Sequence, residues 1–258
     1  MATLAPNVVE TAAELPQYLH AMRVVHTSRH ALTIEAIDER TGSRRAVKRL
    51  RPERMAEAGP HRRLLGEADA LARLGHRNIV HLHGVATCSD SSPALVLEFV
   101  DGPTLRDVML EGRTLPGETI RLLGMHLGLA LAHVHDAGLV HADVKPANVM
   151  LDGERTVLID FHLARRPGAL TSHIGTRGFT APEVVDIDHM GKAADAWGLG
   201  VVLYRARNGA LPDPTRSWWS GESKSWPLID RVIHQLLAPQ PERRLGCARA
   251  AQLLEMGE

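Results

Sequence analysis

The sequence predicts an α+β fold in which a smaller, β-rich N-terminal part precedes a larger, helical C-terminal part. Two observations lead to this prediction. Between residues 18 and 50, short apolar bursts are separated by a polar turn at 38–43, which is typical of a β-meander. Residues 117–137 then form a long, mostly apolar segment that ends before Gly138, which indicates a buried helix with a glycine cap. At 258 residues, the chain can form one large domain or two lobes.

The elements that follow the meander are predicted from local patterns. Apolar residues recur at helical spacing over 62–74, so we expect a helix there that stops at Gly75 and carries Glu67 close to its apolar stripe. An apolar run over 94–100, bounded by polar and proline residues, predicts a strand. Thr104 is a good N-cap for a short helix over 105–111.

Composition excludes several classes of function. The formal net charge is zero, so bulk charge predicts no nucleic-acid partner. The sequence has no apolar run of the roughly 18 residues that a membrane span needs, and its N-terminus has no signal-peptide pattern. The two cysteines, Cys88 and Cys247, lie far apart and form no metal-ligand pattern, which favours a cytoplasmic protein.

Residues 141–161 carry the polar groups that phosphoryl transfer requires. Asp143, Lys145, Asn148 and Asp160 are expected in one short strand-loop-strand segment. One carboxylate can orient a hydroxyl and accept its proton, an amide and a second carboxylate can hold Mg²⁺, and the ammonium can neutralise a moving phosphoryl group. The alternative is an ordinary polar turn between two strands, which explains this particular set of residue types less well.

Further motifs follow in a fixed order along the chain. Lys48 ends an Ala-Val-Lys strand, Gly175 precedes Thr176, and residues 181–183 read Ala-Pro-Glu. Residues 195–197 read Asp-Ala-Trp, and residues 241–244 read Pro-Glu-Arg-Arg. From about residue 18 to residue 254, this ordered set resembles the eukaryotic-type (Hanks-type) Ser/Thr protein kinase family, in a bacterial-like form. The resemblance implies a two-lobed kinase fold, with residues 1–17 as a lead-in, 18–100 as the N-lobe and 101–258 as the C-lobe.

The resemblance also implies roles for individual residues, with ATP and Mg²⁺ (or Mn²⁺) as cofactors. Asp143 is the expected base, and Lys145 is expected to contact the γ-phosphate. Three further groups of residues are implied: Asn148 and Asp160 for the metal; Lys48 with Glu67 for the α- and β-phosphates; and Glu98, Val100, Thr33, Ala46 and Met150 for adenine.

Structural roles in the second lobe are implied as well. Thr176 is expected against the catalytic aspartate and lysine, and it favours Ser/Thr over Tyr as the acceptor. Asp195 is expected to hold the backbone of the catalytic loop. Glu183 is expected to form a buried ion pair with Arg244, and His141 is expected to stack with Phe161.

Three departures from the family pattern stand out. The glycines of the usual phosphate-binding loop are replaced by His26, Ser28 and Ala31, so the main chain has less freedom to approach phosphates. The position before Asp143 is Ala142 rather than arginine, which predicts no switch by activation-loop phosphorylation. His162 replaces the glycine that usually follows Asp-Phe.

Three functions compete. The leading interpretation is an ATP-dependent Ser/Thr protein or peptide kinase. A pseudokinase acting as a nucleotide-sensing or scaffolding module is the alternative, and a small-molecule phosphotransferase is disfavoured by the motifs at 175–176, 181–183 and 195–197. The stretch from Trp218 to Trp226 is either a loop pinned by its aromatic rings or a docking surface for a partner protein or substrate peptide.

Overall fold

The computed structural model describes residues 15–169, 175–186, 189–213 and 226–257. The chain divides into two compact units, which are described separately. The first unit contains residues 1–75 and 80–100, and the second contains residues 76–79 and 101–258. Trp218 and Trp219 of the predicted tryptophan-rich stretch lie outside the described residues.

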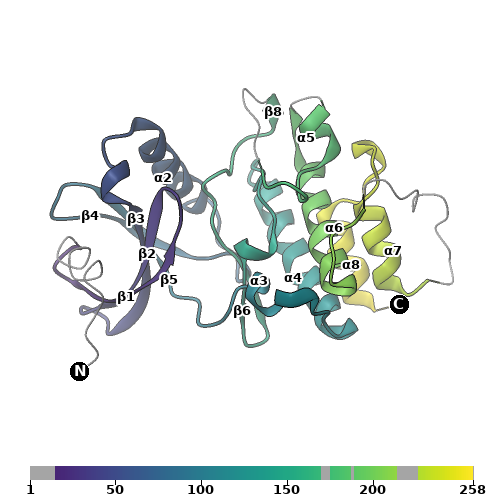
Figure 1. Cartoon of the computed structure of the whole chain (residues 1–258), viewed down its shortest axis with the longest axis horizontal. Coiled ribbons are helices and arrows are strands. Elements are labelled where there is room, and N and C mark those ends of the chain that lie inside the picture. Colours follow the sequence, from purple (N-terminus) through teal and green to yellow (C-terminus); the bar gives the residue numbers. More distant parts are fainter. Residues whose placement is uncertain (1–14, 170–174, 187–188, 214–225, 258) are drawn as a thin grey trace. The chain divides into compact units, whose positions relative to one another are not determined.

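The first unit is built on an antiparallel five-stranded sheet with strand order β1-β2-β3-β5-β4 (Figure 1). The strands are β1 (Leu19–Thr27), β2 (Ala31–Asp38), β3 (Ser43–Leu50), β4 (Leu82–Thr87) and β5 (Pro93–Glu98). The first three form the predicted meander, which is therefore confirmed. The strand expected over 94–100 begins one residue earlier and ends two residues earlier.

The two faces of this sheet have different chemistry because side chains alternate along a strand. Ile34 and Val47 are paired across β2 and β3 and lie in a buried apolar cluster, together with Leu15 from before β1. Thr33 and Lys48 form the neighbouring pair and therefore point to the opposite face. Ala46, two positions before Lys48, shares that face.

Helix α2 (Ala58–Leu71) packs against β3, β4 and β5 and follows a short 3₁₀ helix, η1 (Pro52–Arg54). The prediction of a helix over 62–74 was therefore wrong at both ends. The helix begins four residues earlier because Pro60, which interrupts a helical pattern in sequence, is tolerated in a first turn where its missing N–H has no partner to lose. It ends at Leu71, before the expected stop at Gly75.

The second unit is mainly helical (Figure 1). Its helices are α3 (Leu105–Val108), η2 (Leu110–Gly112), α4 (Gly117–Asp136), η3 (Pro146–Asn148), α5 (Pro182–Asp186), α6 (Lys192–Asn208), α7 (Leu228–Leu236), η4 (Pro241–Arg243) and α8 (Cys247–Met256). Its strands pair as β6 (Val149–Asp152) with β7 (Arg155–Leu158), and β8 (Gly168–Ala169) with β9 (His189–Met190). The predicted 105–111 helix is in fact divided between α3 and η2, although Thr104 caps α3 as expected by accepting the Asp107 N–H.

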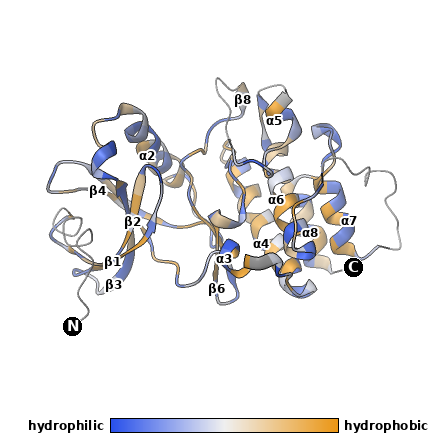
Figure 2. Ribbon diagram, in the orientation of Figure 1, coloured by the Kyte–Doolittle hydropathy of each residue, from blue (hydrophilic) through white to orange (hydrophobic). Residues whose placement is uncertain are grey.

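The core of the second unit forms around α4, which runs one residue short of the predicted end. Gly138, with φ +74°, supplies the left-handed residue after the helix, as predicted. Apolar residues colour much of α4 orange in Figure 2. A Cβ atom at Gly128 would lie 2.9 Å from the Cys247 carbonyl oxygen, so glycine allows α8 to approach α4 closely. No helix in the described part of the chain has the length and apolar character that crossing a bilayer requires.

Candidate active site

The loop of residues 141–148, called the catalytic loop after its expected role, is held by one carboxylate of α6. Asp195 Oδ2 accepts the His141 N–H at 2.8 Å, and Asp195 Oδ1 accepts the Ala142 N–H at 2.9 Å. Asp195 is 1% exposed, so these hydrogen bonds satisfy a charge that would otherwise be costly to bury. The predicted role of Asp195 in holding this loop is consistent with this geometry.

The loop adopts a conformation that its sequence does not favour. Ala142 has φ +67°, a left-handed value that costs a residue with a Cβ atom free energy. The Asp195 bond to its amide helps to keep it there. A Cβ atom at Gly198 of α6 would lie 2.8 Å from Val144 Cβ, so the loop can dock this closely only because residue 198 is glycine.

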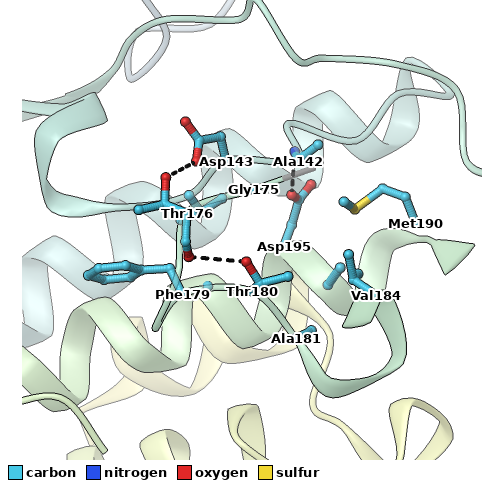
Figure 3. A pocket seen from close by; sticks show the side chains of 13 residues that line it. Ala142, Asp143, Gly175, Thr176, Phe179, Thr180, Ala181, Val184, Met190 and Asp195 are labelled. Atoms are coloured by element: carbon cyan, nitrogen blue, oxygen red, sulfur yellow. Dashed lines mark hydrogen bonds between the residues drawn. The ribbon is translucent and has the colours of Figure 1, made fainter. Parts of the chain in front are cut away.

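Asp143 lies at the centre of a polar network, and its hydrogen bond with Thr176 is drawn in Figure 3. Its Oδ1 accepts the Thr176 hydroxyl at 2.8 Å, and its Oδ2 accepts the Asn148 side-chain amide at 3.0 Å. Lys145 Nζ lies 2.6 Å from Asp143 Oδ2 and donates to Thr176 Oγ1 at 2.9 Å. The expected contact of Thr176 with the aspartate and the lysine is confirmed. Together, these contacts fix the orientation of a 5% exposed carboxylate.

Asn148 and Asp160 are adjacent through the main chain, although β6 and β7 separate them in sequence. The Ile159 N–H donates to the Asn148 carbonyl at 2.9 Å, next to the β6–β7 ladder. Asn148 Nδ2 donates to both the main-chain oxygen and Oδ2 of Asp143, so its Oδ1 is the atom that remains to face a cation. The sequence suggested one strand on each side of the loop, but both strands lie between Asn148 and Asp160.

This pair fits Mg²⁺, which uses one or two protein oxygens and fills its other positions with water and phosphate. No group of three or more acidic, histidine or cysteine ligands occurs among the residues with described positions. Asp160 has φ +63°, a strained value typical of functional positions. His162 Nδ1 lies 2.8 Å from Asp160 Oδ1, so the histidine that replaces the family's glycine contacts the expected metal ligand directly.

His141 and Phe161 form the predicted ring contact. Their centroids lie 4.7 Å apart with an interplanar angle of 74°, and both residues are fully buried. The Asp143 N–H donates to His141 Nδ1 at 3.3 Å, so the ring proton belongs on Nε2, which lies 3.2 Å from the Ile159 carbonyl oxygen. This neutral ring therefore links the catalytic loop to the chain before Asp160.

The segment after Phe161 is anchored at several points within the second unit. Val140 and Arg165 exchange two main-chain hydrogen bonds, of 2.8 and 3.0 Å, and β8 pairs with β9. Arg244 forms the predicted buried ion pair with Glu183, with N–O distances of 2.5 and 3.0 Å. Arg244 also donates to the carbonyl oxygens of Ala193, Ala238 and Pro239.

A small pocket opens beside Asp143 between the catalytic loop and the segment after Gly175 (Figure 3). Apolar side chains form much of its wall: Phe179, Ala181, Val184 and Met190. Thr180 closes one side and donates to the Thr176 carbonyl at 3.0 Å. The pocket therefore brings apolar and polar side chains together next to the network around Asp143.

In the first unit, Lys48 and Glu67 form the expected ion pair. Lys48 Nζ lies 2.7 Å from one Glu67 carboxylate oxygen and 2.9 Å from the other, and Glu67 is 1% exposed. Thr33 and Ala46, expected near adenine, share the Lys48 face of the sheet and are partly exposed. The pair therefore places an oriented ammonium next to a partly open surface.

The other residues expected near adenine lie at the ends of strands. The Glu98 N–H donates to the His81 carbonyl at 2.8 Å, and Val100, two residues later, is buried. Met150 lies in β6 of the second unit, where it is partly buried and forms an isolated antiparallel β-bridge with Thr104.

Sequence reasoning missed two buried polar residues of the second unit. His135 of α4 lies with Nε2 2.9 Å from Asp195 Oδ2, and Asn78 donates from Nδ2 to the Thr156 carbonyl at 2.8 Å. His135 lies four residues after the buried Leu131, so its place on the apolar face was a usable signal.

Trp226, the described residue of the tryptophan-rich stretch, contacts His234 edge-on, with ring centroids 5.5 Å apart.

Comparison with known proteins supports this reading of the geometry. A family model described as "Protein kinase domain" matches residues 29–255. CBL-interacting serine/threonine-protein kinase 7 of Arabidopsis thaliana is 33% identical over 226 residues, covering 78% of this chain and 51% of the relative. Serine/threonine-protein kinase PkaA of Streptomyces coelicolor is 34% identical over 217 residues, covering 81% of this chain and 38% of the relative. The chain thus spans about half or less of these relatives.

Proposed function

Because the chain belongs to the protein kinase family, we propose that it transfers the γ-phosphate of ATP to a serine or threonine hydroxyl of a protein or peptide. The observation that supports this most directly is the network around Asp143. A carboxylate held by Thr176, Lys145 and Asn148 is oriented to accept a proton from an acceptor hydroxyl.

The roles of the other residues follow from their chemistry. Lys145 lies next to Asp143 and neutralises negative charge that develops on the transferred group. Asn148 and Asp160 hold Mg²⁺ (or Mn²⁺), which when bound offsets the charge of the phosphates. Lys48, oriented by Glu67, holds the nucleotide's α- and β-phosphates, and adenine lies against Thr33, Ala46 and Met150, with hydrogen bonds to the main chain near Glu98 and Val100.

One wall of the small pocket beside Asp143 belongs to the segment that the Glu183–Arg244 pair anchors. This anchored segment supports a peptide acceptor, because it offers a fixed platform next to Asp143.

The location of the protein is proposed from its cysteines. Cys88 and Cys247 are both buried and carry no disulfide bond. A chain that keeps its thiols reduced is typical of the cytoplasm, so we propose a cytoplasmic kinase.

The experiment that tests the proposal compares nucleotide binding and phosphate transfer in wild type and Lys48→Met. We expect wild type to bind Mg-ATP and to phosphorylate itself or a mixed serine/threonine peptide library, and we expect Lys48→Met to lose transfer. Lys192→Met, which makes the same change at an exposed lysine, is the matched control and should behave as wild type. A wild type that neither binds Mg-ATP nor transfers phosphate, with Mg²⁺ or Mn²⁺, would support the pseudokinase alternative instead.

A further inference from the structure

The hairpin between β1 and β2 is closed at its tip by a serine side chain. Ser28 Oγ accepts the N–H groups of Ala31 and His30, at 3.0 and 3.4 Å. The Ser28 N–H and hydroxyl both donate to the Ala31 carbonyl, at 2.9 and 3.1 Å. Three of the four amides from Ser28 to Ala31 therefore already donate within the hairpin.

This closed tip differs from a loop whose main chain cradles phosphates. An amide that has a partner inside the protein must break that bond before it can donate to a phosphate oxygen. The tip also adopts no left-handed backbone: the non-glycine residues with positive φ in the described ranges are Ser91, Ala142 and Asp160. Where the family has glycines, this chain has a turn whose amides donate to its own oxygen atoms. Other groups must therefore bind the phosphates.

Positive side chains gather at the same tip. Arg29 is exposed at its apex. The pKa of His30 is lowered first by burial and then by the positive charges of Arg29, Arg54 and Arg63. Glu57, which opposes this effect, pairs with Arg54 at 2.7 Å, so these two charges offset each other. The charges of Arg29 and Arg63 remain and make the surface at the tip locally cationic.

Side chains of the hairpin also share the sheet face that carries Lys48. His26 pairs with Thr33, and Thr33 pairs with Lys48, so one row across β1, β2 and β3 leads to the lysine. Ala31, the first residue of β2, lies two positions before Thr33, or about 7 Å along the strand, and Arg29 lies beyond Ala31 in the turn. A long arginine side chain at the turn can cover part of this distance, and phosphates that extend from Lys48 can cover the rest.

We propose that the Arg29 guanidinium binds the β- and γ-phosphates of the nucleotide, in place of the main-chain amides of the hairpin tip. A planar guanidinium offers two parallel N–H groups to one phosphate, which compensates for the amides that Ser28 withholds. This inference rests on the proposed kinase function and names a second residue of the first unit, besides Lys48, that holds the phosphates.

The test measures dissociation constants of Mg-ATP and adenosine for the full chain by calorimetry. Arg29→Ala should weaken Mg-ATP binding by about tenfold or more, because a charge-assisted hydrogen bond is lost, and should change adenosine binding by less than about twofold. Arg73→Ala is the control: it removes the same charge at an exposed position just after the C-terminal end of α2, and it should change neither dissociation constant. Thermal unfolding of each variant checks that it is folded.

A double variant tests whether Ser28 is the reason that the main-chain amides do not bind the phosphates. In Ser28→Gly/Arg29→Ala, the amides of residues 30 and 31 lose their internal acceptor, so part of the lost Mg-ATP affinity should return. Mg-ATP binding by Arg29→Ala that equals wild type would overturn the proposal, as would an equal loss of adenosine binding. A double variant as weak as Arg29→Ala would contradict the inferred role of Ser28. A wild type that binds no nucleotide would instead overturn the kinase function itself.

Discussion

His135 Nε2 lies 2.9 Å from Asp195 Oδ2, and this contact joins α4 to α6 directly beneath the catalytic loop. The same carboxylate oxygen accepts the His141 N–H, and the other accepts the Ala142 N–H. One buried carboxylate therefore receives three donors, and two of them set the backbone from which Asp143 projects. The position of Asp143, the proposed base, therefore depends on the buried pair His135–Asp195.

Replacing His135 with phenylalanine should destabilise the protein and impair transfer. The ring remains, but Asp195 loses one donor while still buried, which should lower the free energy of unfolding by about 1–3 kcal/mol. Urea unfolding measures this loss, and steady-state kinetics should show a lower kcat with little change in the KM for ATP. Unchanged stability would mean that the histidine contributes no net hydrogen bond to Asp195.

Gly198→Ala should move the catalytic loop. Its Cβ atom would lie 2.8 Å from Val144 Cβ and 3.1 Å from the Val144 carbonyl oxygen, so loop and helix must separate. Because displacements of about 1 Å cost up to a hundredfold in rate, we expect kcat to fall at least tenfold. Gly66→Ala is the control, since nothing lies within 4 Å of its Cβ position and helix propensity should make it slightly stabilising. Equal kcat values for the two variants would contradict the close packing.

The hydroxyl of Thr176 should matter more than its methyl group. It donates to Asp143 and accepts from Lys145, so Thr176→Val removes both hydrogen bonds while keeping the shape. We expect a loss in kcat of roughly ten- to a hundredfold for valine, corresponding to one or two hydrogen bonds between charged groups, and near wild-type activity for Thr176→Ser. Transfer assays at saturating Mg-ATP distinguish the two. A serine variant as slow as the valine variant would show that the methyl group is what matters.

Phosphorylation at residues 171 and 172 should not be needed for activity. Ala142 occupies the position whose arginine would receive a phosphate, and the described residues on either side of 170–174 are held by the β8–β9 pairing and by the Glu183–Arg244 ion pair. The double variant Thr171→Ala/Ser172→Ala should therefore keep its basal rate within about twofold of wild type. Mass spectrometry on the wild type shows whether these residues are modified at all. A tenfold loss would reveal a phosphate-dependent switch.

The strands, the long helix and several contacts between distant residues were predictable from sequence. The meander followed from its apolar spacing and polar turn, and the buried pair Glu183–Arg244, 61 positions apart, followed from motif order. Motif order carries such information because a shared fold brings the same positions together. Local spacing alone would not have related Asp195 to the amides of residues 141 and 142.

Other features could not be predicted because they depend on tertiary contacts. The start of α2 was missed: the expected helix began at residue 62, whereas the helix begins at Ala58 with Pro60 in its first turn. The Ser28 closure of the β1–β2 tip needs a particular backbone geometry that sequence does not specify. The burial of His135 could be inferred from its spacing after Leu131, but its partner could not, because only the folded chain brings Asp195 of α6 against it.

The most direct test of the central claim is single-turnover phosphate transfer by Asp143→Asn beside wild type. If Asp143 accepts the proton of the acceptor hydroxyl, its amide replacement should slow transfer by about 10²–10⁴-fold. Mg-ATP affinity should stay within about twofold of wild type, because the expected phosphate and metal contacts belong to other residues. A variant that transfers phosphate at the wild-type rate would contradict the assignment of Asp143 and the network built around it.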